Sequence, residues 1–184
     1  MTASMYMPRV RALALGCWLA LAAGCAAQQV PEALPRLANP DLERRLTRLL
    51  RYDVPVIGAD SLRRLASTDV LILDAREPVE YAVSHIPGAV QIDPKGKLPA
   101  WIDEVPRARQ VTVYCSVGYR SENLARRLEE AGFTKVSNLY GSIFDWVDRG
   151  LPLEDSDGNA THRIHTYNQR WSRLVTSPDA EKVW

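Results

Sequence analysis

Two short apolar runs, each followed at once by a polar residue, most limit the folds open to this chain. Residues 70–73 (Val-Leu-Ile-Leu) stop at Asp74, and residues 111–114 (Val-Thr-Val-Tyr) stop at Cys115. Continuous apolarity, rather than alternation, is typical of strands that are covered on both faces, as in a parallel sheet. The two runs therefore predict a sheet buried between layers of helices.

Segments with helical spacing separate the expected strands. Helices are expected at residues 41–50, 59–66, 121–131 and 143–150, and further extended segments at 54–57 and 135–139. Asn39 or Asp41 is placed to cap the first helix. Strands that alternate with helices predict one α/β domain, with a mainly parallel central sheet and helices on both faces.

The segment 115–121 (Cys-Ser-Val-Gly-Tyr-Arg-Ser) lies where an expected strand gives way to a helix. In an open parallel sheet, ligands bind beyond the carboxyl ends of the strands, and the amides of a loop that enters a helix form an anion site. Gly118 would let this loop turn tightly. The amides, the helix dipole and Arg120 would all lower the pKa of Cys115. The segment therefore predicts an activated cysteine nucleophile that needs no general base.

Two other interpretations can be weighed against this one. Cys115 could be a small buried residue that ends a strand, as free cysteines often are. The glycine, the arginine and the helix start within the same few residues favour the nucleophile. A nucleic-acid partner is excluded, because 23 basic and 22 acidic residues give a net charge of only +1 and no long-range attractive field.

Several segments together resemble the single-domain rhodanese family, over about residues 54–153. They are residues 73–77 (Leu-Asp-Ala-Arg-Glu) with Glu80-Tyr81, residues 85–89 (His-Ile-Pro-Gly-Ala), the loop 114–121, and Gly141 with Trp146. The resemblance implies the rhodanese-like three-layer fold and a sulfurtransferase. It also implies that Cys115 carries sulfane sulfur as a persulfide, with no metal and no organic cofactor.

The same resemblance implies roles for individual residues. The loop would hold the persulfide and the substrate through Ser116, Val117, Gly118, Tyr119, Arg120 and Ser121. Arg120 would help to bind an anionic donor, and Asp74, close to the loop, would be a further substrate-binding residue. Arg76 is a further candidate for substrate contact, with an ion pair to Glu77 as the alternative. His85 could suggest a Cys–His pair, but it is expected to hold a structural turn before a short strand at 89–92.

The spacing from Cys115 to Arg120 favours sulfur chemistry over phosphate chemistry. It resembles the C-x-x-x-x-R loop of sulfurtransferases, whereas the related phosphatases and arsenate reductases have one residue more, and a shorter ring of amides suits a sulfur atom. The expected reaction moves sulfane sulfur from thiosulfate or a persulfide donor to a thiol or cyanide acceptor. The alternatives are a non-enzymatic module that binds a periplasmic partner or delivers sulfur to it, and a redox role for the thiol.

Residues 1–24 are typical of an export signal. Arg9 and Arg11 precede an apolar stretch of about 14 residues, shorter than the ~20 that cross a bilayer as a helix. Residues 21–25 (Leu-Ala-Ala-Gly-Cys) resemble the lipobox of bacterial lipoproteins, with Ala22 where leucine is more usual. Cys25 is therefore expected to become a lipidated N-terminus, with ordinary signal cleavage nearby as the alternative.

The rest of the chain divides around the expected domain at 41–153. Residues 25–40 are expected to form a flexible tether to the membrane. Ala26, rather than aspartate, follows Cys25 and favours the outer over the inner membrane of the cell envelope, with the domain facing the periplasm. Residues 154–184 form a C-terminal extension of no predicted role, although Tyr167, Trp171 and Trp184 suggest that it packs against something.

Overall fold

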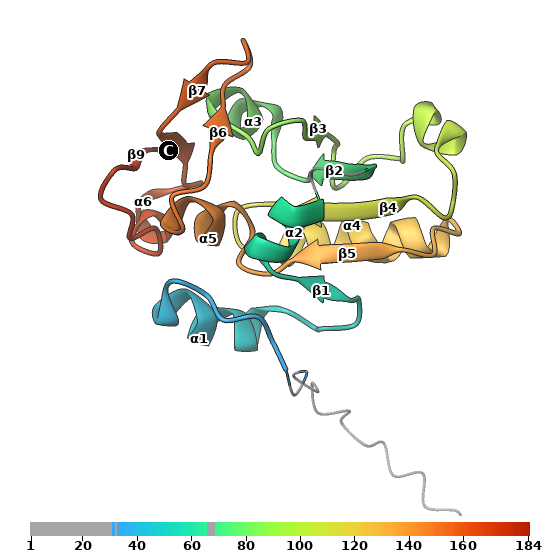
Figure 1. Ribbon diagram of the computed structural model, residues 1–184, viewed down its shortest axis with the longest axis horizontal. Helices are drawn as coiled ribbons and strands as arrows, with labels where there is room; N and C mark the ends of the chain where they lie inside the picture. Colours follow the sequence, from blue (N-terminus) through green and yellow to red (C-terminus); the bar gives the residue numbers. More distant parts are fainter. Residues whose placement is uncertain (1–30, 32, 66–68) are drawn as a thin grey trace, which may run out of the picture.

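A parallel sheet of five strands forms the centre of the computed structural model, which describes residues 31, 33–65 and 69–184 (Figure 1). The strands are β1 (Val56–Ile57), β2 (Val70–Asp74), β3 (Val90–Gln91), β4 (Gln110–Tyr114) and β5 (Val136–Leu139), in the order β1-β5-β4-β2-β3. This arrangement confirms the predicted α/β class. The proposed export signal and Cys25 lie outside the described residues.

Helices cover both faces of the sheet. The elements on one face are α1 (Pro40–Leu49), α2 (Ala59–Leu65) and α5 (Ser142–Asp148), and those on the other are α4 (Tyr119–Glu130) and the 3-10 helix η1 (Ala100–Glu104). The pleat of β2 serves both cores, because Ile72 packs with the first group and Leu71 and Leu73 pack with the second. The continuous apolarity of this strand thus reflects burial on both sides.

The first helix confirms its predicted cap but begins before the predicted domain boundary. The side chain of Asn39 accepts hydrogen bonds from the amides of Asp41 and Leu42, which satisfies donors at the helix start. Leu37 is buried in the core, and the amide of Ala38 donates to Asp145 Oδ1 at 2.7 Å. The prediction of a tether that extends to Pro40 was therefore wrong at its C-terminal end, because residues just before the helix fill part of the core.

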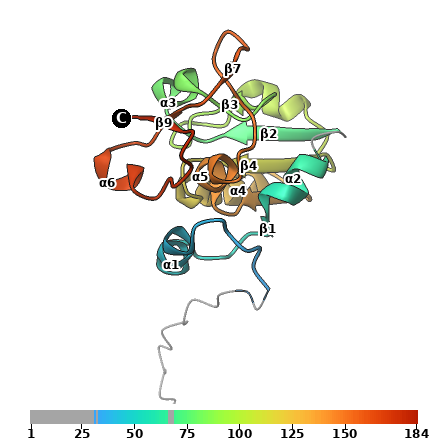
Figure 2. The same ribbon diagram turned by 60° about the vertical axis from the view of Figure 1, so that its left-hand side comes forward.

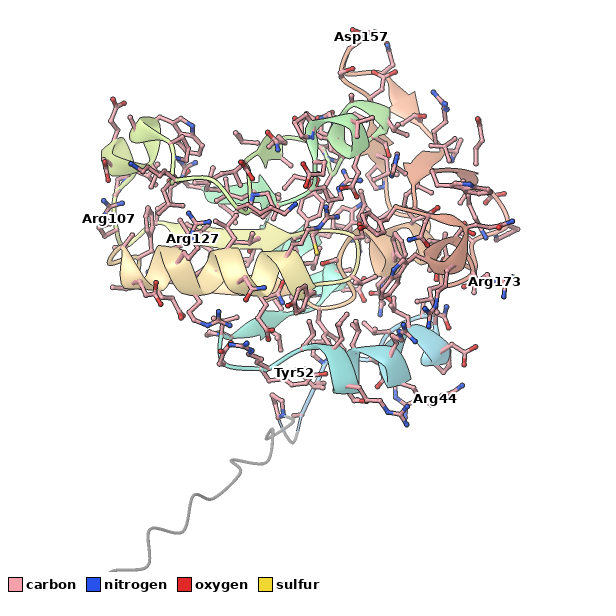
Figure 3. All side chains as sticks on the ribbon, turned by 180° about the vertical axis from the view of Figure 1, so that it is seen from behind. Arg44, Tyr52, Arg107, Arg127, Asp157 and Arg173 are labelled. Atoms are coloured by element: carbon pink, nitrogen blue, oxygen red, sulfur yellow. The ribbon has the colours of Figure 1, made fainter. Side chains whose placement is uncertain are left out.

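The C-terminal residues belong to the fold rather than trailing from it. They form β6 (Leu153–Glu154), β7 (Ala160–Thr161), β8 (Arg163–His165), α6 (Gln169–Ser172) and β9 (Glu181–Val183). Ile164 and Val175 are buried in the same core as α1 and α5. Figures 1 and 2 place this segment at the end of the sheet where the strands have their carboxyl ends. The turn between β6 and β7, which carries Asp157, projects outward (Figure 3).

None of the helices in the described ranges is both long and apolar enough to cross a membrane.

An ion pair without solvent contact joins Asp74 at the end of β2 to Arg76. Both side chains are fully buried, and Arg76 Nη2 lies 2.6 Å from Asp74 Oδ2 and donates to the carbonyl of Ser84 at 2.6 Å. Burial alone would lower the pKa of Arg76, but the charge of Asp74 keeps it above its ordinary value. The expectation that Arg76 contacts substrate was wrong, because its guanidinium is fully buried and forms an ion pair with Asp74. Its partner is Asp74 rather than Glu77.

We predict that Arg76→Met lowers the free energy of unfolding by roughly 3–5 kcal/mol, because it leaves the Asp74 carboxylate buried without a partner. Urea denaturation of the purified protein would measure this loss. The double variant Asp74→Asn/Arg76→Met should recover part of it. Arg44→Met, in an exposed pair with Asp41, is the control and should have little effect. A similar small effect for Arg76→Met would contradict the prediction.

Candidate active site

Cys115 lies at the floor of a cleft of about 310 Å³, directly after the end of β4. The residue is only 1% exposed, yet it is among those that line the cleft, so the thiol is covered without being sealed in the core. The lining residues are Leu49, Glu77, Lys95, Cys115, Ser116, Val117, Tyr119, Arg120, Tyr167 and Trp171. Four of the loop residues predicted from the sequence to hold the substrate are therefore in place.

The backbone of the loop points its amides toward the sulfur atom. Gly118, at the start of α4, has φ +113, and its amide donates to Cys115 Sγ at 3.2 Å. This left-handed conformation is the reason why glycine suits the position. On the other side, the amides of Ile143 and Phe144 donate to the carbonyls of Cys115 and Ser116 at 3.2 and 3.3 Å. The start of α5 thus binds two loop carbonyls, while the amides of Gly118 and Ser121 contact the sulfur.

The surroundings of Cys115 favour the thiolate. Burial alone raises the pKa of this thiol, but the positive charge of Arg120 and hydrogen bonds from Ser121 and from the amide of Gly118 more than offset it. The pKa of Cys115 is therefore lower than that of an ordinary cysteine, as the sequence predicted. A thiolate in this position is a ready nucleophile.

Arg120 is positioned by a carboxylate that the sequence analysis did not assign to the site. This residue is Glu80, from α3 (Pro78–Val83), and it is 1% exposed. Its carboxylate accepts hydrogen bonds from Arg120 Nη1 at 2.5 Å and from Arg120 Nη2 at 2.8 Å. The hydroxyl of Ser116 donates to Glu80 at 3.1 Å. Burial raises the pKa of Glu80, but Arg120 and the amide of Glu77 outweigh it and keep the carboxylate ionised. The charge that was expected to bind an anionic donor is thus already balanced.

A buried asparagine connects the loop to the neighbouring strand. Asn138 of β5 accepts a hydrogen bond from Ser121 Oγ at 2.7 Å and donates to the carbonyl of Gly118 at 3.0 Å. Ser121 therefore acts from beneath the loop rather than lining the cleft. A polar amide within a strand that is otherwise buried was the one signal in the sequence that could have identified Asn138.

Asp74 and His85 both lie outside the cleft. Asp74 is beside the end of β4, where it is paired in register with Tyr114, but it faces Arg76 and does not line the cleft. His85 lies in a structural turn, as expected. Its ring stacks on Tyr81 with centroids 3.8 Å apart, and its Nδ1 lies 3.1 Å from the carbonyl of that residue.

The cleft also has a wall that sequence reasoning missed. Tyr167 and Trp171 reach it from the C-terminal segment, and Leu49 reaches it from the end of α1. The guanidinium carbon of Arg120 lies 5.8 Å from the centroid of the Tyr167 ring, and that of Arg45 lies 5.2 Å from the Trp171 ring. Aromatic residues in the tail indicated packing, but nothing local to them indicated the partner.

Comparison with known proteins agrees with this geometry. The family model described as "Rhodanese-like domain" matches residues 59–149. A sulfurtransferase from Allochromatium vinosum is 40% identical over 104 residues, which cover 55% of this chain and 96% of that protein. A solution structure of a rhodanese-like domain from Anabaena is 26% identical, with a TM-score of 0.51 over 55% of this chain and 79% of that one. The chain therefore belongs to the rhodanese-like family, and its sulfurtransferase relatives support a role in sulfur transfer.

Other relatives share only this domain. A tRNA uridine(34) hydroxylase from Listeria monocytogenes is 38% identical over 84 residues, which cover 43% of this chain but 26% of the hydroxylase. The aligned residues thus leave most of the hydroxylase without a matching segment in this chain.

We predict that the rate at which Cys115 reacts with iodoacetamide rises with pH to a plateau, with a midpoint below that of an ordinary thiol. Below the midpoint the sulfur is protonated and unreactive. Arg120→Met should move the midpoint upward, because it removes the nearest positive charge. Alkylation rates measured across a pH series test both statements.

Arg126→Met is the matched control for this measurement. Arg126 lies on the same helix, but it pairs with Asp53 and does not line the cleft. Its loss should leave the midpoint in place. An equal midpoint for wild type and Arg120→Met would contradict the assigned role of Arg120.

Proposed function

We propose that Cys115 accepts sulfane sulfur from thiosulfate or a persulfide donor and passes it to a thiol or cyanide acceptor. The observation that carries this proposal is the thiol at the floor of an open cleft, with the amide of Gly118 directed at its sulfur and Arg120 favouring its ionised form. The similarity to a sulfurtransferase over nearly the whole length of that protein supports the same reaction.

The reaction consists of two displacements at sulfur. The Cys115 thiolate attacks the outer sulfur of thiosulfate, a new S–S bond forms, and sulfite leaves with the electron pair of the old one. An acceptor thiolate or cyanide then attacks the outer sulfur of the persulfide and releases the Cys115 thiolate. No net oxidation occurs, and the thiolate needs no general base because its proton is already lost.

The loop suits both states of the nucleophile. The amides that stabilise the thiolate can follow the negative charge when it moves to the outer sulfur of the persulfide, one bond further into the cleft. Glu80 keeps Arg120 in a fixed position at the loop, through two hydrogen bonds. The main-chain donors and the fixed cation of Arg120 therefore stabilise the negative charge on the thiolate and on the persulfide.

We predict that incubation with thiosulfate adds the mass of one sulfur atom to the purified protein and that Cys115→Ser abolishes this adduct. Intact-protein mass spectrometry would detect it, and addition of cyanide should remove it with formation of thiocyanate. A steady-state assay with thiosulfate and cyanide should lose essentially all activity in the variant, because serine cannot form a persulfide.

The choice of controls separates sulfur transfer from simple loss of the fold. Ser121→Ala removes the hydrogen bond from Ser121 Oγ to Asn138 beneath the loop but keeps the Ser121 amide, and it should reduce the rate without eliminating the adduct. Failure of the wild-type protein to form an adduct with thiosulfate or with a persulfide would refute the proposal. Full complementation by Cys115→Ser in the native organism would instead favour a non-enzymatic binding module.

We further propose that the protein is held in the cell envelope by a lipid on Cys25 and faces the periplasm. The basis is residues 1–25, in which a short apolar stretch ends at a lipobox-like sequence. We predict that Cys25→Ala moves the protein from the membrane fraction to the soluble fraction, whereas Cys17→Ala does not. Immunoblots of fractionated cells would measure this. Retention of Cys25→Ala in the membrane fraction would reject lipid attachment.

A further inference from the structure

The cleft above Cys115 has more room than a small inorganic donor needs. Its volume of about 310 Å³ lies within the range of pockets that hold organic ligands. The loop after β4 forms only the floor, while Tyr167 and Trp171 form a wall that comes from the C-terminal segment. Thiosulfate bound at the floor would leave much of this space to water.

The cations that line the cleft are already paired. Arg120 contacts Glu80 at 2.5 Å, and Lys95 Nζ lies 3.3 Å from Glu77 Oε1. Once Cys115 is ionised, these five groups carry a net negative charge. A dianion such as thiosulfate therefore finds no unpaired cation among the described lining residues. Among the other lining residues, Ser116 is polar and donates its hydroxyl to Glu80. The rest are apolar or aromatic, namely Leu49, Val117, Tyr119, Tyr167 and Trp171.

Tyr167 is held at the cleft in an unfavourable backbone conformation. Its φ of +67 lies in the left-handed region, which disfavours bulky residues. The residue is 57% exposed, so burial in the core does not explain the position. The ring instead lies 5.8 Å from the guanidinium carbon of Arg120, next to the loop. Strained backbone of this kind is concentrated at functional sites.

Trp171 is fixed more firmly than Tyr167. It packs against the hydrophobic core, and Arg45 of α1 lies over its ring at 5.2 Å. The wall thus combines one anchored indole with one exposed phenol ring. Flat aromatic surfaces of this kind bind apolar or aromatic groups well.

We propose that Tyr167 and Trp171 bind the organic body of the substrate, so that the protein exchanges sulfane sulfur with a compound that carries an apolar or aromatic group in preference to thiosulfate. This inference rests on the proposed function of Cys115 and names the substrate class of that site. The thiolate attacks the outer sulfur of an organic persulfide or thiosulfonate, the S–S bond breaks, and its electron pair leaves with the thiolate or sulfinate.

Thiosulfate and benzenethiosulfonate form a matched pair of probes. In both, the outer sulfur is attached to an oxidised sulfur atom, and a phenyl ring replaces one charged oxygen in the second. The measured quantity is the ratio of kcat/KM for benzenethiosulfonate to that for thiosulfate, with cyanide as acceptor. Comparison of this ratio between variants removes the difference in intrinsic reactivity between the two donors.

We expect Tyr167→Gly and Trp171→Leu each to lower this ratio by roughly tenfold, through loss of contact with the phenyl ring. Glycine accepts the left-handed backbone at 167 without strain, so that variant tests the ring alone. Tyr167→Phe keeps the ring and should keep the ratio. Trp184→Ala removes an exposed aromatic residue of the same segment that does not line the cleft, and should also keep the ratio.

The ratio could stay unchanged in both wall variants while Cys115 persulfide still forms from each donor. That result would refute the binding of the organic group by Tyr167 and Trp171 and leave the proposed function intact. Failure of the wild-type protein to form persulfide from either donor would instead overturn the proposed function. Circular dichroism shows whether Trp171→Leu folds. If it does not, the Tyr167 variants decide, because that ring is exposed and contributes little packing.

Discussion

A buried thiol whose surroundings favour its ionised form is the constraint on which the rest of the site depends. Covering a charge is costly unless fixed dipoles or an opposite charge replace the lost water. Burial alone raises the pKa of Cys115, and the loop amides and Arg120 reverse that effect. The loop amides and Arg120 must be held in place for this effect, and hydrogen bonds to neighbouring elements hold them. The start of α5 binds the loop carbonyls, Asn138 holds the loop to β5, and Glu80 fixes Arg120.

The support behind the loop is polar and shared among neighbouring strands. Asp74 at the end of β2 is paired in register with Tyr114 at the end of β4, and its carboxylate holds Arg76 in the interior. Asn138 provides the corresponding link on the β5 side. The groups around the thiol are held by hydrogen bonds to neighbouring elements, so its donors are arranged before a substrate binds. Donors arranged in this way are how preorganised sites stabilise charge.

The cleft has two sources in the chain. Residues 59–149, which match the family model, contain the thiol, its loop and Glu80. Leu49, Tyr167 and Trp171 lie outside that range, before and after it, and they provide an apolar wall. The nucleophile and its support thus come from the family's core, and three of the ten residues that line the cleft come from the flanking segments. Comparison with relatives that share only the core can therefore inform the chemistry more than the specificity.

Local sequence determined the α/β layers, the strand ends, the cap at Asn39 and the place of Cys115, because strand, loop and helix follow one another within a few residues. The pairing of Arg76 with Asp74, the approach of Glu80 to Arg120, and the return of Tyr167 to the cleft were decided only by the tertiary structure. Arg76 and Asp74 are only two residues apart, and it is their complete burial that the packing of the layers decides. The contacts of Arg120 with Glu80 and with Tyr167 join residues 40 and 47 positions apart in the chain. No local pattern of apolar and polar residues records which distant partner a charged or aromatic side chain meets once the layers pack.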